Sequence, residues 1–270
     1  MDWFNSEYYH ILYRNRDNKE AETFINNIIK KLDLKIGLKV LDLACGKGRH
    51  STYLEKLGFI VTGIDKSINN IIKARENENE NLNFLNKEMI DDLDGKYDAI
   101  FNLFTSFGYI DEDYNLKTIN NINNHLKDDG YLIIDYLNSI LAEHNLIEKE
   151  KKLINNINFK IRRVSDNNFI RKTITFTDKK KYKFNEKVMK LSLDDFKSYF
   201  EKYNLEIVNC FGNYQLDAFD VKNSERLIMV IKKSQPKKTG IRGRQWHTLP
   251  PYGSTICATG LNFSVRNGKR

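Results

Sequence analysis

A short segment near residue 45 combines a buried-strand pattern, an acid and two glycines. Residues 40–43 are apolar except for Asp42, and Gly46 and Gly48 follow them. A parallel strand that leads through a glycine turn into a helix brings backbone amides close to a nucleotide, because glycine has no Cβ to block the turn or the ligand. Asp65 follows Gly46 by nineteen residues, close to the roughly 20 expected of an acid that binds ribose hydroxyls. The pattern therefore predicts a nucleotide site at the end of a buried strand.

The elements that must position these residues alternate between strands and helices. Apolar residues at helical spacing predict helices over 2–13, 17–32 and 51–57. Strand and helix patterns then alternate up to about residue 138. Such alternation predicts a parallel sheet that is covered by helices on both faces.

The pattern changes near residue 150. Three runs with short connections alternate apolar and polar residues: 158–164, 169–176 and 182–191. They predict an antiparallel insertion with one apolar face and one face rich in Lys and Arg. Residues 193–203 return to helical spacing, and 205–211 and 227–231 predict a closing pair of antiparallel strands.

The glycine loop resembles the first motif of the class I S-adenosylmethionine (SAM)-dependent methyltransferases, an acid followed by x-x-x-Gly-x-Gly. Asp42, Gly46 and Gly48 match it as they stand, and Ala44 occupies a position where the family often has another glycine. Four later segments resemble the next four strands of the family, in the same order: 61–67, 83–89, 97–104 and 130–135. The resemblance implies an α/β, Rossmann-like fold: a seven-stranded, mostly parallel sheet with an antiparallel terminal strand pair, plus the small β insertion.

This interpretation divides the chain into five parts. They are an N-terminal helical lid, a SAM-binding core, the antiparallel insertion, a C-terminal helix with the closing strands, and a disordered or non-native tail: 1–36, 37–149, 150–192, 193–235 and 236–270.

The resemblance also implies SAM as the cofactor. Asp42 and the loop backbone would hold the methionine part, Asp65 the ribose, and Glu88 with Met89 the adenine. The expected cofactor-binding residues are Asp42, Ala44, Cys45, Gly46, Gly48, Asp65, Lys66, Ser67, Glu88, Met89, Leu103 and Phe104. Two structural alternatives stay open: Asp42 as a buried acid satisfied by loop amides, and Asp65 as the cap of the helix that begins near Ser67.

The expected reaction is in-line transfer of a methyl group to O or N of a small molecule. The protein mainly aligns the reactants and excludes water, and no metal is needed. His50 and Tyr109 are the candidate catalytic residues. The expected substrate contacts are Tyr9, Tyr13, Ser106, Tyr109, Tyr214 and Arg226. Ordinary packing also explains the aromatic residues in this set, and a structural polar role also explains His50.

Two other functions stay open. An NAD(P)-dependent oxidoreductase would share the fold, but Ser51 stands where the dinucleotide fingerprint has its last glycine. A SAM-binding protein without catalysis is the second alternative, and product formation would distinguish it from an enzyme.

Most of the net charge of +8 comes from the last 35 residues. Residues 236–270 hold seven basic residues, all three prolines and no acid, so the preceding residues carry 37 basic and 36 acidic side chains. A nearly neutral body argues against binding of bulk nucleic acid. We interpret the tail as a disordered extension, with a basic arm for RNA or an anionic membrane as the alternative.

The remaining features predict a cytoplasmic enzyme that does not act in a membrane. The N-terminus lacks the layout of a signal peptide, and no segment approaches the roughly 18 apolar residues of a membrane span. Cys45, Cys210 and Cys257 form neither a disulfide framework nor a metal motif. The sequence leaves open whether the protein is a monomer or a homodimer.

Overall fold

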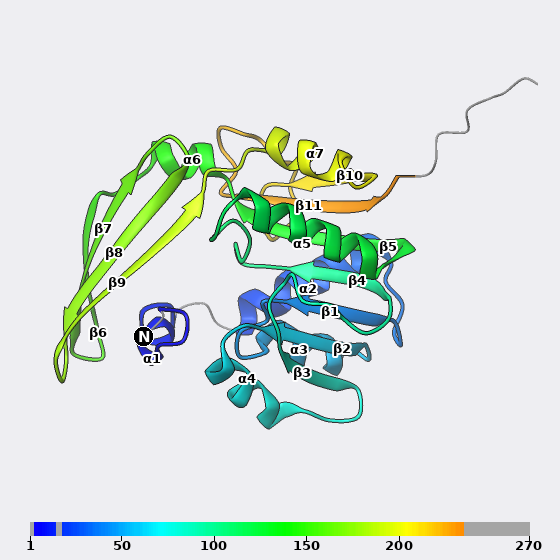
Figure 1. Ribbon diagram of the computed structural model, residues 1–270, viewed down its shortest axis with the longest axis horizontal. Coiled ribbons are helices and arrows are strands. Elements are labelled where there is room, and N and C mark those ends of the chain that lie inside the picture. The colour runs from blue at the N-terminus through cyan, green and yellow to red at the C-terminus, as the bar shows by residue number, and fades with distance from the viewer. Residues whose placement is uncertain (1–2, 15–17, 235–270) are drawn as a thin grey trace, which may run out of the picture. The chain divides into compact units, whose positions relative to one another are not determined.

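The computed structural model describes residues 3–14 and 18–234. The tail predicted at 236–270, with Cys257, lies outside the described residues. The described residues form two sheets and the helices that pack on them (Figure 1).

The main sheet has seven strands in the order β10-β11-β5-β4-β1-β2-β3. Its parallel strands are β1 (Lys39–Leu43), β2 (Ile60–Asp65), β3 (Leu82–Asn86), β4 (Tyr97–Asn102) and β5 (Leu126–Leu137). The closing strands β11 (Arg226–Lys233) and β10 (Leu205–Phe211) run antiparallel, with β11 between β5 and β10. This topology confirms the predicted fold class.

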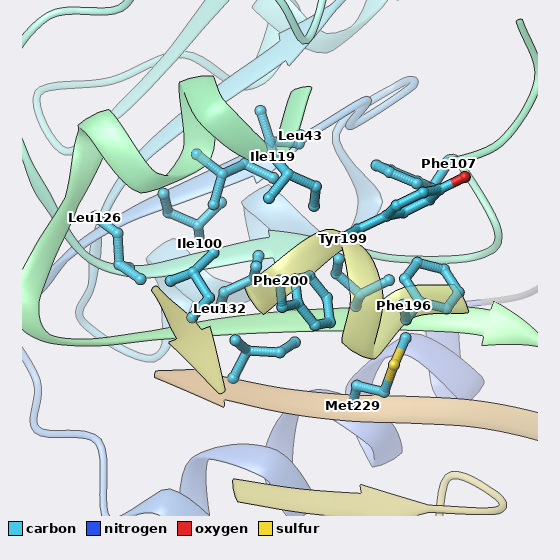
Figure 2. Packing of buried hydrophobic residues seen from close by; sticks show 14 of the residues in the cluster. Leu43, Ile100, Phe107, Ile119, Leu126, Leu132, Phe196, Tyr199, Phe200 and Met229 are labelled. Atoms are coloured by element: carbon cyan, nitrogen blue, oxygen red, sulfur yellow. The ribbon is translucent and has the colours of Figure 1, made fainter. Parts of the chain in front are cut away.

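Helices cover both faces of the main sheet because its central strands are apolar on both sides. Leu41 and Leu43 of β1 face one hydrophobic core, and Val40 faces the other. The first core is closed by α5 (Glu112–His125) and α7 (Leu193–Glu201), and the second by α2 (Asn18–Leu32), α3 (Arg49–Lys56) and α4 (Ile68–Ala74). A one-turn helix, η1 (Arg75–Asn77), follows α4. Figure 2 shows the first core, where Phe196 and Phe200 of α7 lie near Leu132 and Met229 of the sheet.

The second sheet is antiparallel and follows the short helix α6 (Ser139–His144). Its four strands lie in chain order: β6 (Lys149–Ile154), β7 (Ile157–Ser165), β8 (Phe169–Thr177) and β9 (Lys181–Met189). The sequence predicted only the last three. The first was missed because β6 is an edge strand whose residues, Lys-Glu-Lys-Lys-Leu-Ile, carry no apolar alternation. Lysines on an edge strand discourage pairing with another chain.

The first helix is shorter than the sequence predicted. Helix α1 spans Glu7–Leu12, because Ser6 is its N-cap and accepts a hydrogen bond from the Tyr8 amide at 3.2 Å. Residues 3–6 form a turn instead. Figure 1 shows α1 beside the second sheet, where Trp3, Tyr8 and Leu12 join an apolar cluster with strand residues such as Phe159 and Phe184.

Candidate functional site

The carboxyl ends of β1, β2, β3 and β4 surround a cavity, which we call the inner cavity. Open α/β sheets bind ligands at this edge. Ten residues predicted from the sequence line it: Tyr9, Ala44, Gly46, Asp65, Lys66, Glu88, Met89, Phe104, Ser106 and Tyr109. The other lining residues were not among the predicted site residues: Phe4, His10, Asn70, Lys87, Thr105, Gly108, Ile110 and Tyr114.

The glycine loop has the conformation that a close backbone approach requires. Gly46 has φ 58°, and a Cβ added there would meet no atom within 4 Å, so this side of the loop is open. Ala44 also has a left-handed φ of 60°, which explains the family's preference for glycine at this position. Gly48, the N-cap of α3, has φ 80°, and a Cβ there would lie 2.5 Å from the Phe84 ring. The two glycines therefore serve different purposes, an open cradle and close packing.

Asp65 joins the glycine loop to the start of α4. Its carboxylate accepts hydrogen bonds from the amides of Gly46 at 2.9 Å and Ser67 at 2.8 Å. Its side chain is buried apart from the part that lines the cavity. Burial raises the pKa of Asp65, and the bonds from Ser67 and Gly46 oppose that rise. The cap of α4 is Ser67, which accepts from the Asn70 amide, rather than Asp65.

Asp42 lies beneath the loop and does not line the cavity. Its carboxylate accepts a 2.6 Å hydrogen bond from the Ser51 hydroxyl and a further bond from the Ser51 backbone, so a residue of α3 satisfies it rather than the loop amides. Burial raises the pKa of Asp42 to about 7, and the bond from Ser51 opposes this.

The raised pKa of Asp42 predicts a pH-dependent stability. The folded protein holds a proton on Asp42 that the unfolded chain releases near pH 4, so the protonated acid stabilises the fold at low pH. This stabilisation is lost as the pH rises toward 7. Between pH 5 and pH 8, the free energy of unfolding of ligand-free wild type should fall by about 2–3 kcal/mol relative to that of ligand-free Asp42→Asn. Denaturant unfolding of both proteins across this range measures it, and a constant difference would contradict the assignment.

The part of the inner cavity near Glu88 contains a residue that the sequence analysis missed. The Tyr114 hydroxyl donates a 3.2 Å hydrogen bond to Glu88, and both residues line the cavity. The sulfur of Met89, beside them, accepts from the Asn102 amide at 3.3 Å. Tyr114 lies on α5, outside the segments that carried the resemblance, and therefore gave no signal in the sequence.

A buried ion pair holds the loop that follows β4. Asp135 of β5 is 0% exposed, and its carboxylate accepts from the Arg226 guanidinium at 2.7 Å. The same carboxylate accepts from the Phe104 amide at 2.9 Å and the Tyr214 hydroxyl at 3.0 Å. Arg226 also donates to the Thr105 hydroxyl at 2.9 Å. Asp135 thus fixes Phe104 and Thr105 at the cavity wall.

The fixed loop is strained. Phe104 and Thr105 have φ values of 64° and 56°, a left-handed conformation that is uncommon for residues other than glycine. Such strain persists only where surrounding contacts determine the conformation. The Arg49 guanidinium stacks on the Phe104 ring, with its central carbon 4.7 Å from the centre of the ring. Several interactions therefore hold Phe104 in this conformation.

A second cavity, which we call the outer cavity, adjoins the first. Both cavities are lined by Phe4, Tyr9, Phe104, Thr105 and Tyr109. The predicted residues Tyr13 and Arg226 line only the outer one. The inner face of the second sheet adds a charged wall that the sequence analysis did not identify: Glu150, Lys152, Arg163, Lys172 and Glu186.

The charged wall is organised by ion pairs across the strands. Glu150 pairs with Arg163 at 2.7 Å and Lys152 at 3.1 Å, and Lys172 pairs with Glu186. Glu150 and Lys152 share β6, whereas the other two pairs join neighbouring strands, and spacing in the sequence does not reveal that those residues meet.

The N-terminal segment, residues 3–14, spans from the second sheet to the main sheet. Tyr13 donates to Glu186 at 3.3 Å on one side. On the other side, a ring nitrogen of His10 lies 3.1 Å from the Asn70 side-chain oxygen, and the Phe4 ring packs against Tyr109. The segment lines both cavities, and its role as a lid stays a prediction.

Seven predicted site residues line neither cavity: Asp42, Cys45, Gly48, His50, Ser67, Leu103 and Tyr214. His50 is buried, and burial lowers its pKa to about 3, so its ring stays neutral and is a weak base. The Tyr214 hydroxyl donates its hydrogen bond to Asp135 and so helps to hold that carboxylate. Burial raises the pKa of Tyr109, so its phenol keeps its proton at neutral pH.

The segment that contains the glycine loop and the parallel strands is similar in sequence to a known protein family. A family model described as a methyltransferase domain matches residues 34–202. The chain belongs to this family. The match favours the SAM-dependent methyltransferases over the NAD(P)-dependent oxidoreductases.

The curated relatives of this methyltransferase include the glycine/sarcosine N-methyltransferase of Aphanothece halophytica. The two sequences are 32% identical over 130 residues, which is 46% of this chain and 48% of the relative. The chain thus matches about half the length of this relative.

Solved structures share the fold of the methyltransferase. A SAM-dependent methyltransferase from Clostridium acetobutylicum superimposes with a TM-score of 0.72 at 19% identity, covering 84% of this chain and 96% of the other. A SAM-bound amino pentose methyltransferase from Micromonospora echinaspora gives a TM-score of 0.62 at 16% identity, covering 85% and 98%. Within residues 3–14 and 18–234, no helix is both long and apolar enough to cross a membrane.

Proposed function

We propose that the protein transfers the methyl group of SAM to O or N of a small polar molecule. The inner cavity would hold SAM, and the outer cavity would hold the methyl acceptor. The observation that carries this assignment is the wall of five residues that the two cavities share, three from the loop after β4 and two from the N-terminal segment. A donor and an acceptor bound on either side would meet at Phe104, Thr105 and Tyr109.

The residues of the inner cavity fit SAM. The open side of Gly46 would let the backbone approach the methionine part. Asp65 has acceptor capacity for ribose hydroxyls, because a carboxylate offers about four acceptor sites. Glu88 and Met89 would face the adenine, with Tyr114 holding the Glu88 carboxylate. When bound, SAM supplies a methyl group on a positively charged sulfur, which is already a good electrophile.

The chain's own contribution is alignment and exclusion of water. Asp135 and Arg226 hold the loop that carries Phe104 in place, and the N-terminal segment, which lines both cavities, would shield them from water. Such positioning supplies much of the rate of a reaction between two bound partners. Tyr109 keeps its proton, so we assign it a role as a hydrogen-bond donor to the acceptor rather than as a base. The neutral, buried His50 has a structural role in this proposal.

The charged wall supports a polar, charged acceptor. Glu150, Arg163, Lys172 and Glu186 present both signs of charge to the outer cavity, which suits a molecule with an amino or acidic group. The names of the glycine/sarcosine and amino pentose methyltransferases are consistent with a nitrogen acceptor. We also propose a cytoplasmic location, which the free thiols of Cys45 and Cys210 would suit.

Thermal unfolding with SAM, S-adenosylhomocysteine, NAD and NADP tests the proposal. A ligand at about 100 times its Kd adds about 2.7 kcal/mol of stability, which raises Tm by several degrees in a domain of this size. We expect the two adenosyl compounds alone to stabilise the protein. Stabilisation by NAD alone would overturn the proposal. Release of S-adenosylhomocysteine with glycine, sarcosine and amino sugars as trial acceptors then distinguishes an enzyme from a binding protein.

A further inference from the structure

The outer face of the second sheet carries eight basic side chains and no acidic one. Successive side chains of a strand point to opposite faces, and the face opposite the apolar cluster is what we call the basic face. Its cations are Lys149, Lys151, Lys160, Arg162, Arg171, Lys181, Lys183 and Lys187. Seven of them are exposed, and Lys187 is partly exposed.

Like charges lie directly opposite one another on this face. Lys151 pairs in register with Lys160, Lys149 with Arg162, and Arg171 with Lys187. Such cross-strand pairs destabilise a sheet. Among the ion pairs of the described residues, only Arg171 of the eight has an acidic partner, Asp166 at 2.7 Å. The arrangement costs stability in the protein alone, which an anionic partner would offset.

The basic face makes the body strongly asymmetric in charge. Residues 1–235 are nearly neutral, with 37 basic and 36 acidic side chains. The eight cations of the basic face leave 29 basic and 36 acidic residues for the remainder. The small net charge alone therefore does not exclude a polyanion, because an average conceals separated charges. A polyanion can bind a basic face on a neutral protein.

The composition of the face favours a phosphate backbone over a protein or a membrane. Cores of protein interfaces are depleted in Lys, whereas six of these eight cations are Lys. Membrane-surface elements combine basic residues with a large apolar surface, whereas only Leu153 and Val164 are large exposed apolar side chains here. Asn185 stands between the cations. The Thr173 hydroxyl donates to the Asn185 side-chain oxygen at 2.9 Å, which leaves the Asn185 NH2 group to donate to phosphate or sugar oxygens.

The width of the sheet favours RNA over DNA. Four strands at about 4.8 Å spacing span about 14 Å before side chains are added, which is too broad for the DNA major groove of about 12 Å. Double-helical RNA presents a wide, shallow minor groove bordered by phosphates, which a flat surface can follow. We propose that the basic face docks double-helical RNA through its phosphate backbone, independently of the methyl-transfer site.

The test compares two charge-reversal variants of the full chain. Lys160→Glu/Arg162→Glu changes the basic face, and Lys30→Glu/Lys56→Glu makes the same charge change at exposed lysines of α2 and α3. The first variant should fold normally, because its new acids lie opposite Lys151 and Lys149. The basic tail, 236–270, is present in every protein, so its contribution to RNA binding is the same in wild type and in both variants. Fluorescence anisotropy with a labelled 20-base-pair RNA duplex at 50–200 mM salt measures binding.

We expect the basic-face variant to bind the duplex at least tenfold more weakly than wild type at 100 mM salt. The slope of log K against log salt should fall by about 1.5–2 for two lost phosphate contacts. The control variant should bind within about threefold of wild type. Equal losses in the two variants would overturn the proposal. So would undetectable RNA binding at 50 mM salt, or tighter binding to the same sequence as DNA or to vesicles containing phosphatidylserine.

Discussion

Asp65→Ala is expected to weaken SAM binding by about 10- to 150-fold, which corresponds to about 1.5–3 kcal/mol. The substitution removes a charged acceptor from the inner cavity, and it also releases the Gly46 and Ser67 amides that the carboxylate now holds. Both losses act in the same direction, because the freed glycine loop must be ordered again when the ligand binds. Isothermal titration calorimetry with SAM and with S-adenosylhomocysteine measures the effect.

Ribose recognition and loop ordering can be separated with a modified ligand. Wild type should bind the 2′-deoxy analogue of S-adenosylhomocysteine more weakly than the parent compound, whereas Asp65→Ala should barely distinguish the two. Asp128→Ala removes an exposed acid that pairs with Lys233 at 3.1 Å and is the matched control for charge. If a folded Asp65→Ala protein bound SAM as tightly as wild type, Asp65 would have no part in the site.

The sequence predicted those parts of the fold in which local pattern and burial agree. The parallel sheet followed from apolar strand segments, because strands buried on both faces leave a continuous apolar run. The number of strands, seven, came from the resemblance to the methyltransferases. Strand β6 was missed because it is charged and lies at an edge. The start of α1 was predicted too early, because the aromatic residues at 3 and 4 continue a helical pattern that Ser6 interrupts.

The inner cavity was more predictable than the outer one for a similar reason. Ala44, Gly46 and Asp65 lie in short motifs whose spacing reflects one strand–helix–strand unit. The charged wall consists of residues that meet only when β6, β7, β8 and β9 pair in a particular register. Sequence spacing does not fix that register, so Arg163 and Glu186 gave no signal.

Asp135 did leave a signal that the sequence analysis did not use. It ends the apolar run Leu132-Ile133-Ile134, and an acid in a buried strand needs partners because an unpaired buried charge is costly. The same argument applied to Asp42 in β1. Arg226 was predicted as a substrate contact, and the structure shows that it lines the outer cavity and that its guanidinium pairs with this acid.

Asp135→Ala is expected to have the largest effect on stability of any change at the site, about 3–5 kcal/mol. Removing one partner of a buried ion pair leaves the other charge uncompensated, and Arg226 is mostly enclosed. The Phe104 amide and the Tyr214 hydroxyl would lose their acceptor as well. Chemical denaturation measures the free energy of unfolding, and Asp128→Ala should change it little, because exposed ion pairs contribute little.

A double substitution tests whether the uncompensated charge causes this loss. Asp135→Leu/Arg226→Met replaces both charges with apolar side chains of similar size, and it should be more stable than Asp135→Ala. Recovery of stability should not restore the loop, because the backbone amide of Phe104 would still lack its acceptor. The double variant should therefore fold well but turn over more slowly than wild type with any acceptor found. A double variant as unstable as Asp135→Ala would show that packing, rather than charge, makes Asp135 necessary.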